Sequence, residues 1–479
     1  MAILEQLEPK KVFHFFEEMS AIPRGSGNTQ AVSDWCAVFA RERGLKYRQD
    51  ELGNVVIWKD GTSGYEQAAP VILQGHMDMV CAQEAGCTKD MAREGLDLFV
   101  EDDLIGAHGT TLGGDNGIAV AMVMALLDSD DIPHPPIEAV FTVDEEIGLL
   151  GAAGLDMSDL RGRRLINLDS EDEGILTVSC AGGNRTECIL PVSRAPFAGT
   201  TLRVTLDDLA GGHSGAEIIK GSANACVQLG RVLRAMQGAA ALRLVRVDGG
   251  EKDNAIARFA SAVLVTEDEA ALRAAAAEAE AALKREYRLT DPALHLCVET
   301  AEAEQTPLDE DSTRRVICLL HCAPNGIQAM SGDIKGLVQT SLNFGILVTS
   351  DDTVTGSFSV RSSVASQKAL LVDRLRCLTE ALGGRVNTWG DYPAWEYVAD
   401  SPLRACMVDT WRELTEEEPR VEAIHAGLEC GLFAGKLPGL DCVSCGPTMY
   451  DIHTYRERLR ISSVRRTWEY LCAVLKKLN

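Results

Sequence analysis

The sequence predicts an α/β protein that is interrupted by an inserted domain. Short apolar strands alternate with helices in the first 182 residues, which is the pattern of an α/β layer. From about residue 183 the segments become more amphipathic, and the α/β pattern returns after residue 391. A chain of 479 residues is long enough for two or three structural units. We therefore expect one domain made of residues 1–182 and 392–479, and an inserted α+β domain over 183–391.

The elements of the first domain follow from its apolar patterning. An early helix carries an apolar stripe formed by Val12, Phe13, Phe16 and Met19, and a second helix runs from Asn28 to Gly44. A glycine-rich turn at 113–117 precedes a very apolar helix at 118–127. Strands are expected at 54–59, 70–78, 137–146 and 163–172.

The inserted domain contains an amphipathic strand at 201–212 and an alanine-rich helix at 269–287, which is polar enough to be exposed. Its end is marked by a group of aromatic residues that we expect to pack at the junction, Trp389, Tyr392 and Trp395. The first domain then resumes with a helix at 401–416, a strand near Val421 and a final helix at 462–477.

The composition restricts the partners of the protein. The 71 acidic residues exceed the 46 Lys and Arg residues, which gives a formal net charge of −25. Such a surface repels phosphate backbones and anionic lipids, so neither nucleic acid nor a membrane is expected as a partner. No apolar run reaches the roughly 18 residues of a membrane-spanning helix, and no signal peptide is visible. The 15 scattered cysteines are typical of a reducing compartment, so we expect a cytoplasmic protein.

Three predicted strands end in residue types that bind metals, and ligands bind at the carboxyl ends of strands in open α/β sheets. His76 and Asp78 lie two residues apart at the end of one strand, so both face one side. The aspartate can hold the imidazole in the tautomer that leaves the other ring nitrogen free for a metal. The alternative is a buried histidine that merely neighbours a carboxylate.

The other candidate ligands also have plainer alternatives. Asp115, in the glycine-rich turn, fits either an inward-pointing ligand or a helix N-cap. Glu145 and Glu146 follow the most apolar strand, and acids crowded in this way need a neutralising cation unless they form an exposed loop. One of this pair can bind a metal while the other stays free as a base. Asp169 ends another strand and His453 lies in a late loop, where a solvated acid and an exposed histidine are the alternatives.

Together these residues supply two histidines and at least three carboxylates. Mixed nitrogen and oxygen ligands of this kind suit zinc, manganese or cobalt. A shared carboxylate can bridge two metals about 3.5–4 Å apart, and such a pair activates a water and polarises a carbonyl.

Six motifs, found in order, resemble those of a known family: LQGHMDMV (73–80), GTTLGGDNGIA (109–119), FTVDEEIGL (141–149), LINLDSEDEG (165–174), GGHSG (211–215) and HAGLECG (425–431). They are similar to the aminoacyl-histidine dipeptidases, also called cytosolic non-specific dipeptidases or peptidase D. That family belongs with carnosinase, aminoacylase and carboxypeptidase G to the di-zinc peptidases. The resemblance implies a di-zinc exopeptidase-type catalytic domain, with a central mixed sheet flanked by helices, and an inserted lid domain.

The resemblance also implies which residues bind the metals. One zinc would be held by His76, Asp115 and Asp169. The other would be held by Asp115, Glu146 and His453, so that Asp115 bridges the two. Zinc is the expected metal, and cobalt or manganese are expected substitutes.

Roles in catalysis and substrate binding follow from the same resemblance. Asp78 would orient the first histidine, and Glu145 would be the general base that takes a proton from the attacking water. In the lid, His213 would help to stabilise the oxyanion. Asn254 would contact the substrate, and Arg361 would bind the carboxylate of the substrate.

A few further residues stay open. Glu429 and His425 fit either the lining of the pocket or a contact with the amine of the substrate. Two other groups are interpreted as core thiols in preference to metal sites: Cys442 with Cys445, and Cys318 with His321 and Cys322.

The expected function is the metal-dependent hydrolysis of Xaa-His and other unblocked dipeptides. An N-acyl-amino-acid deacylase or a carboxypeptidase on the same scaffold is the nearest alternative, and a non-catalytic metal- or peptide-binding homologue is a remote one. The family resemblance also allows a homodimer, in which the lid histidine acts either on its own chain or on its partner.

Overall fold

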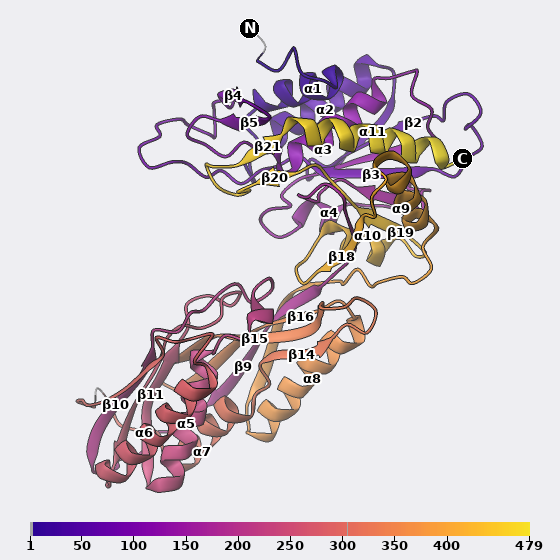
Figure 1. Cartoon of the computed structure of the whole chain (residues 1–479). Helices are drawn as coiled ribbons and strands as arrows, with labels where there is room; N and C mark the ends of the chain where they lie inside the picture. Colours follow the sequence, from indigo (N-terminus) through magenta and orange to yellow (C-terminus); the bar gives the residue numbers. More distant parts are fainter. Residues whose placement is uncertain (1–2, 304) are drawn as a thin grey trace. The chain divides into compact units, whose positions relative to one another are not determined.

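The computed structural model describes residues 3–303 and 305–479, which form two compact units (Figure 1). Unit 1 contains the described residues up to Ser179 together with Tyr397–Ala423 and Leu428–Asn479. Unit 2 contains Cys180–Glu396 and the short segment Ile424–Gly427. The sequence analysis placed the boundaries at 182/183 and 391/392 and did not separate the segment at 424–427. That residues 183–391 form an inserted lid domain stays a prediction.

The centre of unit 1 is a mixed sheet, which has eight strands within the described residues. In spatial order they are β1 (Lys46–Gln49), β2 (Val55–Lys59), β6 (Ile137–Thr142), β3 (Val71–His76), β7 (Arg164–Asn167), β19 (Asp441–Ser444), β8 (Ile175–Cys180) and β18 (Arg420–Ile424). The neighbours β6, β3, β7 and β19 are parallel, whereas β1, β2 and β8 are antiparallel to their partners. The carboxyl ends of four strands therefore meet at one edge of the sheet.

Helices cover this sheet, and their bounds are α1 (Lys10–Ser20), α2 (Gln30–Glu42), α3 (Gly114–Leu127), α4 (Leu150–Gly154), α9 (Pro402–Thr415), α10 (Glu429–Lys436) and α11 (Ile461–Lys477). The helix α3 is buried along its whole length because its sequence is apolar on every side, and it packs between α1 and β3. Gly75 makes this packing possible, since a Cβ there would lie 2.5 Å from the side-chain oxygen of Asn116. A small sheet completes unit 1, with the order β20 (Met449–Tyr450), β21 (Arg458–Arg460), β5 (Leu104–Ala107) and β4 (Leu98–Glu101).

Unit 2 is built on an antiparallel sheet, which has the order β13 (His295–Thr300), β10 (Thr200–Asp207), β12 (Ala260–Thr266), β11 (Leu242–Gly249), β15 (Val338–Thr349), β16 (Thr353–Ser362), β9 (Gly182–Pro191) and β17 (Arg385–Tyr392). The strand β14 (Gly326–Met330) pairs with β15. The helices of this unit are α5 (Ala225–Ala239), α6 (Glu269–Glu286), α7 (Glu310–Cys322), α8 (Ala365–Ala381) and the 3-10 turn η1 (Ile218–Lys220). Figure 1 shows α5, α6 and α7 beside one another along the sheet. The alternating burial along β10 and β16 is typical of strands in a sheet whose two faces differ in exposure.

The predicted α/β fold class with a mixed central sheet is confirmed, while two strands are shorter than expected. The sequence predicted strands at 137–146 and 163–172, whereas β6 ends at Thr142 and β7 covers only Arg164–Asn167. Both strands end before the acidic residues, because these charged side chains turn away from the sheet into loops. Among the described residues, no helix is both long and apolar enough to span a membrane.

Candidate metal centre

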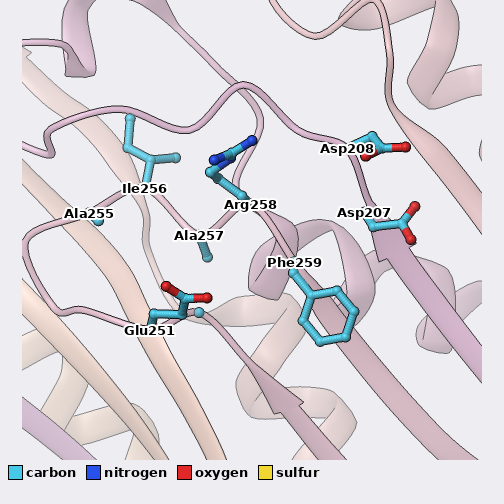
Figure 2. A pocket seen from close by; sticks show the side chains of 9 residues that line it. Asp207, Asp208, Glu251, Ala255, Ile256, Ala257, Arg258 and Phe259 are labelled. Atoms are coloured by element: carbon cyan, nitrogen blue, oxygen red, sulfur yellow. The ribbon is translucent and has the colours of Figure 1, made fainter.

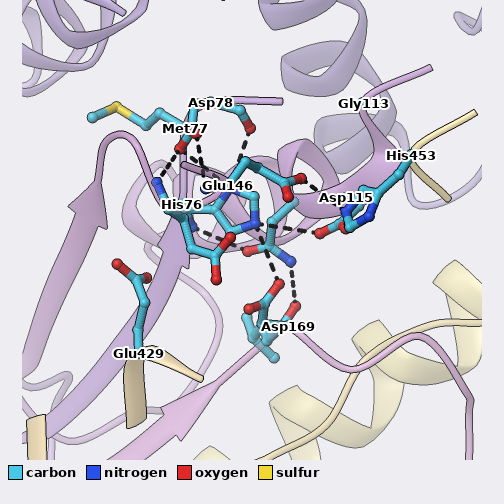
Figure 3. Close-up of polar contacts among 12 residues, drawn as sticks. His76, Met77, Asp78, Gly113, Asp115, Glu146, Asp169, Glu429 and His453 are labelled. Atoms are coloured by element: carbon cyan, nitrogen blue, oxygen red, sulfur yellow. Dashed lines mark hydrogen bonds and ion pairs between the residues drawn. The ribbon is translucent and has the colours of Figure 1, made fainter. Parts of the chain in front are cut away.

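Side chains of unit 1 converge just beyond the carboxyl ends of its parallel strands (Figure 3). His76 is the last residue of β3 and pairs in register with Thr142 at the end of β6. Asp169 follows β7, Glu146 follows β6, and His453 comes from the loop between β20 and β21. Parallel pairing explains why residues so distant in sequence meet, since it places their strand ends at one edge.

Asp115 lies at the centre of this cluster and is only 8% exposed. Its Oδ1 lies 3.3 Å from His76 Nε2, and its Oδ2 lies 3.1 Å from His453 Nε2. Asp169 Oδ1 is 3.5 Å from the same nitrogen of His76, and Glu146 Oε1 is 3.0 Å from the same nitrogen of His453. Each oxygen of Asp115 thus faces its own pair of one histidine and one carboxylate. Ligand atoms of His76, Asp115 and Glu146 all lie within 4.8 Å of one another, close enough to hold a metal ion.

Asp78 is fully buried and connects the first histidine to the acidic loop. Its Oδ1 lies 3.5 Å and its backbone oxygen 3.1 Å from His76 Nδ1. The same carboxylate accepts backbone N–H bonds from Glu145 at 3.0 Å and from Glu146 at 3.3 Å. In the neutral imidazole, a proton on Nδ1 satisfies these oxygens and leaves Nε2 free to bind a metal.

Three residues that were not predicted from the sequence, Asn116, Arg24 and Glu457, bind the backbone of the strand ends and of the glycine-rich turn. Asn116 accepts the N–H of His76 at 3.2 Å and donates its amide to the carbonyl of Leu168 at 2.8 Å. Arg24 and Glu457 bind the backbone of the glycine-rich turn from two sides. Asn116 could have been predicted, because it lies beside Asp115 in the motif GGDNG. Arg24 and Glu457 lie outside all six motifs.

The cluster holds more negative than positive charge, and the pKa values reflect this. Burial raises the pKa of Glu145 well above its usual value, and the charge of Asp169 adds to the effect. Burial also raises the pKa of Asp169 to about 6, with a contribution from the charge of Asp115. Burial opposes the ionisation of Asp115, but hydrogen bonds from His453 and His76 outweigh it and hold the pKa of that carboxyl well below its usual value. A divalent cation would relieve the repulsion among these carboxylates.

Glu429 is the first residue of α10 and is fully buried. Its Oε2 accepts hydrogen bonds from the amide of Gln74 and, at 2.7 Å, from Thr142 Oγ1. Its Oε1 has no hydrogen-bond partner within the described residues. Gln74 and His76 are two residues apart in β3, so Glu429 binds the same face of the sheet that carries the cluster. Burial raises the pKa of Glu429 to about 7.

The residues expected to complete the site from the inserted domain lie in unit 2. His213 Nδ1 accepts N–H bonds from Gly215 at 3.3 Å and from Ala216 at 3.1 Å. The proton of the neutral ring is therefore on Nε2, which can donate a hydrogen bond. Burial, assisted by the positive charge of Arg361, lowers the pKa of His213, so the imidazole is neutral at pH 7.

Arg361 and Asn254 belong to the same unit as His213. Arg361 Nη1 donates to the hydroxyl of Tyr392 at 3.2 Å, and its Nε has no hydrogen-bond partner within the described residues. The backbone oxygen of Asn254 accepts the N–H of the residue after His213. His425 is 8% exposed, and its Nε2 lies 2.7 Å from Ser341 Oγ. Burial, with a smaller contribution from the positive charge of Arg361, lowers the pKa of His425 to about 4. The expected substrate-binding residues of unit 2 thus include a cation and neutral donors.

The segment after Asn254 also lines a separate pocket of about 340 Å³ (Figure 2). The pocket combines three carboxylates and one guanidinium with the aromatic ring of Phe259, which is 46% exposed. The charged residues are Asp207, Asp208, Glu251 and Arg258. None of the site residues expected from the sequence lies in this lining, so the pocket is a feature of unit 2 in its own right.

The two cysteine groups differ from the cluster around Asp115. Cys442, Cys445, Cys318 and Cys322 form no disulfide bond within the described residues. Cys442 and Cys445 are buried, and burial raises the pKa of Cys445 to about 12, which keeps the thiol protonated. Cys318, His321 and Cys322 line a pocket together with two arginines, whose charge opposes the binding of a cation.

Comparison with known proteins gives one family. The model of peptidase family M20/M25/M40 matches residues 72–477. The cytosol non-specific dipeptidase of Escherichia coli (strain K12) is 34% identical over 482 residues, which covers 100% of this chain and 99% of that protein. The crystal structure of aminoacylhistidine dipeptidase from Vibrio alginolyticus is 34% identical, with a TM-score of 0.94 over 99% of this chain and 98% of that one. Aminopeptidase PepT from Bacillus cereus ATCC 10987 shares the fold, with 14% identity and a TM-score of 0.55 over 98% of this chain and 99% of that one.

These matches confirm the family resemblance that the six motifs indicated, and they extend over both units. The family match includes the strand ends that carry the histidine and carboxylate cluster, since it begins at residue 72. The chain belongs to peptidase family M20/M25/M40 and is a peptide-bond hydrolase.

Proposed function

We propose that this protein is a dipeptidase that hydrolyses unblocked dipeptides, Xaa-His among them, with the help of two divalent metal ions. One observation carries the proposal: the two oxygens of Asp115 face two separate pairs of a histidine and a carboxylate. That arrangement is the one a bridging carboxylate requires. The names of the relatives, a cytosol non-specific dipeptidase and an aminoacylhistidine dipeptidase, support the dipeptide substrate.

The residues fit two metal ions by their chemistry. His76 and Asp169 would hold one ion, Glu146 and His453 would hold the other, and Asp115 would be shared. Imidazole nitrogens and carboxylate oxygens suit zinc best, and cobalt or manganese can take its place. The raised pKa values of Asp169 and Glu145 support the same conclusion, because burial beside other carboxylates disfavours the charged form of both groups.

When bound, such ions supply Lewis acidity and lower the pKa of a water to near neutrality. Glu145 would take a proton from the attacking water and pass it to the leaving amine. Its backbone is anchored by the hydrogen bond to Asp78, while its neighbour Glu146 faces His453. Glu146 is thus the member of the pair that faces a candidate ligand, which leaves Glu145 as the candidate base.

Unit 2 would supply the hydrogen-bond donors that the reaction needs. His213 carries its proton on Nε2 and is neutral at pH 7, which suits a donor to the oxyanion of the transition state. Arg361 would pair with the free carboxylate of the dipeptide, and Asn254 would contact the substrate backbone. These roles require unit 2 to act as a lid over a catalytic site, either its own or that of a partner chain in a homodimer.

Glu429 would recognise the free amine of the dipeptide. One of its oxygens is held by Thr142 and Gln74, and the other is buried without a described partner. An ammonium group is the donor that such a carboxylate lacks. A substrate with both ends free would thus find an acid for its amine and an arginine for its carboxylate. We also propose a cytoplasmic location, as the name of the relative from E. coli suggests.

Metal analysis combined with a substrate panel tests the proposal. The purified protein should contain up to two transition-metal ions per chain. A chelator should abolish the hydrolysis of Xaa-His dipeptides, and zinc, cobalt or manganese should restore it. The panel should include N-acetylated amino acids and longer peptides. Faster hydrolysis of the N-acetylated substrates would assign the chain to the deacylases, preference for longer peptides would make it a carboxypeptidase, and full activity without metal would refute the two-ion site.

A further inference from the structure

The backbone of the turn that presents Asp115 is held by one buried carboxylate. Glu457 is only 1% exposed and lies at the end of the loop that also carries His453. Its Oε2 accepts the N–H groups of Leu112 and Gly113, both at 2.9 Å, and its Oε1 accepts the N–H of Asp115 at 3.1 Å. Three backbone donors of one turn thus converge on a single side chain that is not itself a candidate ligand.

A buried guanidinium binds the same turn from another direction. Arg24 is 1% exposed, and it donates to the carbonyl oxygens of Met77 and Gly113. Since Met77 follows His76, Arg24 joins the end of β3 to the turn that carries Asp115. The two residues therefore bind both the N–H groups and a carbonyl of the turn, which fixes its backbone from two sides.

The glycines of the motif GGDNG leave room for these two side chains. Gly113 has φ +64°, which L side chains rarely adopt. A Cβ on Gly117 would lie 2.6 Å from Arg24 Nη2, and a Cβ on Gly114 would lie 3.2 Å from Glu457 Oε1. The motif thus serves two purposes, since it supplies the aspartate and admits the residues that position it.

We infer that Glu457 is a positioning residue for the metal pair, because it holds the backbone of Asp115 where each carboxylate oxygen faces a different histidine. The inference rests on the proposed two-metal function and deepens it. Groups that orient metal ligands typically change metal affinity by about 10–100-fold when they are removed. The expected loss is at this end of the sheet, because the side-chain hydrogen bonds of Glu457 go to the turn that carries Asp115.

The chain contains a matched control for Glu457. Glu138 is also a buried carboxylate, 3% exposed, and it also accepts backbone N–H bonds from a loop, those of Arg161 and Gly162. It lies near the start of β6, at the amino end of the parallel strands, whereas the candidate metal centre lies at their carboxyl ends. Replacing either acid by glutamine leaves buried N–H groups short of an acceptor, so both variants should lose stability.

The experiment titrates metal-free wild-type protein, Glu457→Gln and Glu138→Gln with Zn²⁺ in competition with a chelating dye, and follows thermal unfolding in parallel. We expect both variants to unfold at a lower temperature than the wild type. Only Glu457→Gln should lose metal affinity, by about 10-fold or more for at least one of the two ions. Equal metal affinity in the two variants would overturn the inference.

Amide hydrogen exchange of the metal-free proteins gives a readout that needs neither metal nor activity. The peptide that covers residues 109–119 should exchange faster in Glu457→Gln than in Glu138→Gln. If exchange in this peptide is the same in both variants, Glu457 does not hold the turn and the inference fails. A wild-type protein that binds no Zn²⁺ would instead refute the proposed function, and the positioning role with it.

A second variant covers the case in which Glu457→Gln does not fold. Gly114→Ala removes no polar group, but its new methyl group must displace the carboxylate of Glu457 by a few tenths of an ångström. It should therefore weaken Zn²⁺ binding while Glu138→Gln does not. Wild-type Zn²⁺ affinity in a folded Gly114→Ala protein would contradict the positioning role.

Discussion

The polar cluster of unit 1 and the polar residues of unit 2 differ in the hydrogen-bonding groups they offer. In unit 1, four carboxylates, those of Asp115, Glu145, Glu146 and Asp169, surround two imidazoles, so the cluster consists mainly of acceptors. In unit 2, the guanidinium of Arg361 and the Nε2–H of His213 are donors. The first arrangement is suited to cations, and the second is suited to a carboxylate or an oxyanion.

The difference has a structural origin. The parallel strands of unit 1 end at one edge, where short loops gather charged side chains at close range. The two donors of unit 2 come from a strand and from a loop, since Arg361 lies near the end of β16 and His213 lies in the loop after β10. The comparison teaches that the strand ends of unit 1 gather acceptors while unit 2 presents donors, and mutations in each unit should therefore have different effects.

The largest effect is expected from Glu145, the proposed general base in unit 1. Glu145→Gln should retain both metal ions and the fold, yet lose about 10²–10⁴-fold in kcat, because the amide cannot accept a proton. Glu146→Gln should instead weaken metal binding, since this carboxylate faces His453. Steady-state kinetics together with metal analysis separates the two phenotypes. A reversal of the two would show that the base and the ligand have been exchanged.

The donor of unit 2 should produce the next largest effect. His213→Ala should lower kcat more than it raises KM, because an oxyanion donor acts in the transition state. A loss of about 10²-fold is expected, with metal content unchanged. Mixing this variant with Glu145→Gln should recover part of the activity if the site is completed across a dimer. Wild-type kinetics in His213→Ala would remove unit 2 from the chemistry.

A smaller and more selective effect is expected at Arg361. Arg361→Ala should raise KM for dipeptides with a free carboxylate by about 10–100-fold, since a charged hydrogen-bonded pair contributes about 1.5–3 kcal/mol. C-terminally amidated dipeptides should be affected much less, and they serve as the internal control. An equal loss on both kinds of substrate would mean that Arg361 stabilises unit 2 without contacting the carboxylate.

The last effect concerns stability in the absence of metal, not catalysis. The pKa of Asp169 is raised to about 6 in the folded protein, so the folded state binds this proton more tightly than the unfolded chain does. The resulting stabilisation is present below the ordinary pKa of about 3.9 and is lost as pH rises through 6. When a chelator keeps the protein metal-free, the free energy of unfolding of the wild type should therefore fall by up to about 3 kcal/mol relative to that of Asp169→Asn between pH 4 and pH 7.

Urea unfolding of both proteins across this pH range measures the difference, and added Zn²⁺ provides the control. Bound metal should stabilise the wild type at pH 7 more than it stabilises Asp169→Asn. If the stability difference between the two proteins does not change with pH, burial does not raise the pKa of Asp169 as we describe.

The sequence predicted the parts of the site that depend on local pattern. His76 and Asp78 were recognisable because a two-residue period at a strand end places both on one face, and Asp169 because it directly follows an apolar strand. The carboxylate of Glu457 was not predictable in this way. It binds the N–H of Asp115, which lies 342 positions earlier in the chain, and no periodicity relates two such positions. Contacts of this kind arise from topology, which brings the loop after β20 to the turn before α3.

The fold, like the site, was predictable from the sequence only where local patterns determine it. Alternating helices and apolar strands predicted the α/β layer, because each element buries an apolar face of its own period. The exact strand ends depend on packing between elements, so the sequence placed them only approximately. The short return at 424–427 was not predicted.

The central claim is that Asp115 serves two metal ions at once, and a metal titration of three variants tests it most directly. Metal-free wild-type protein should bind two Zn²⁺ ions per chain. His76→Ala and His453→Ala should each retain one tightly bound ion, because each removes a ligand from only one side of Asp115. Asp115→Asn should weaken both. A wild-type stoichiometry of one, or an Asp115→Asn protein that still binds two ions with wild-type affinity, would contradict the account.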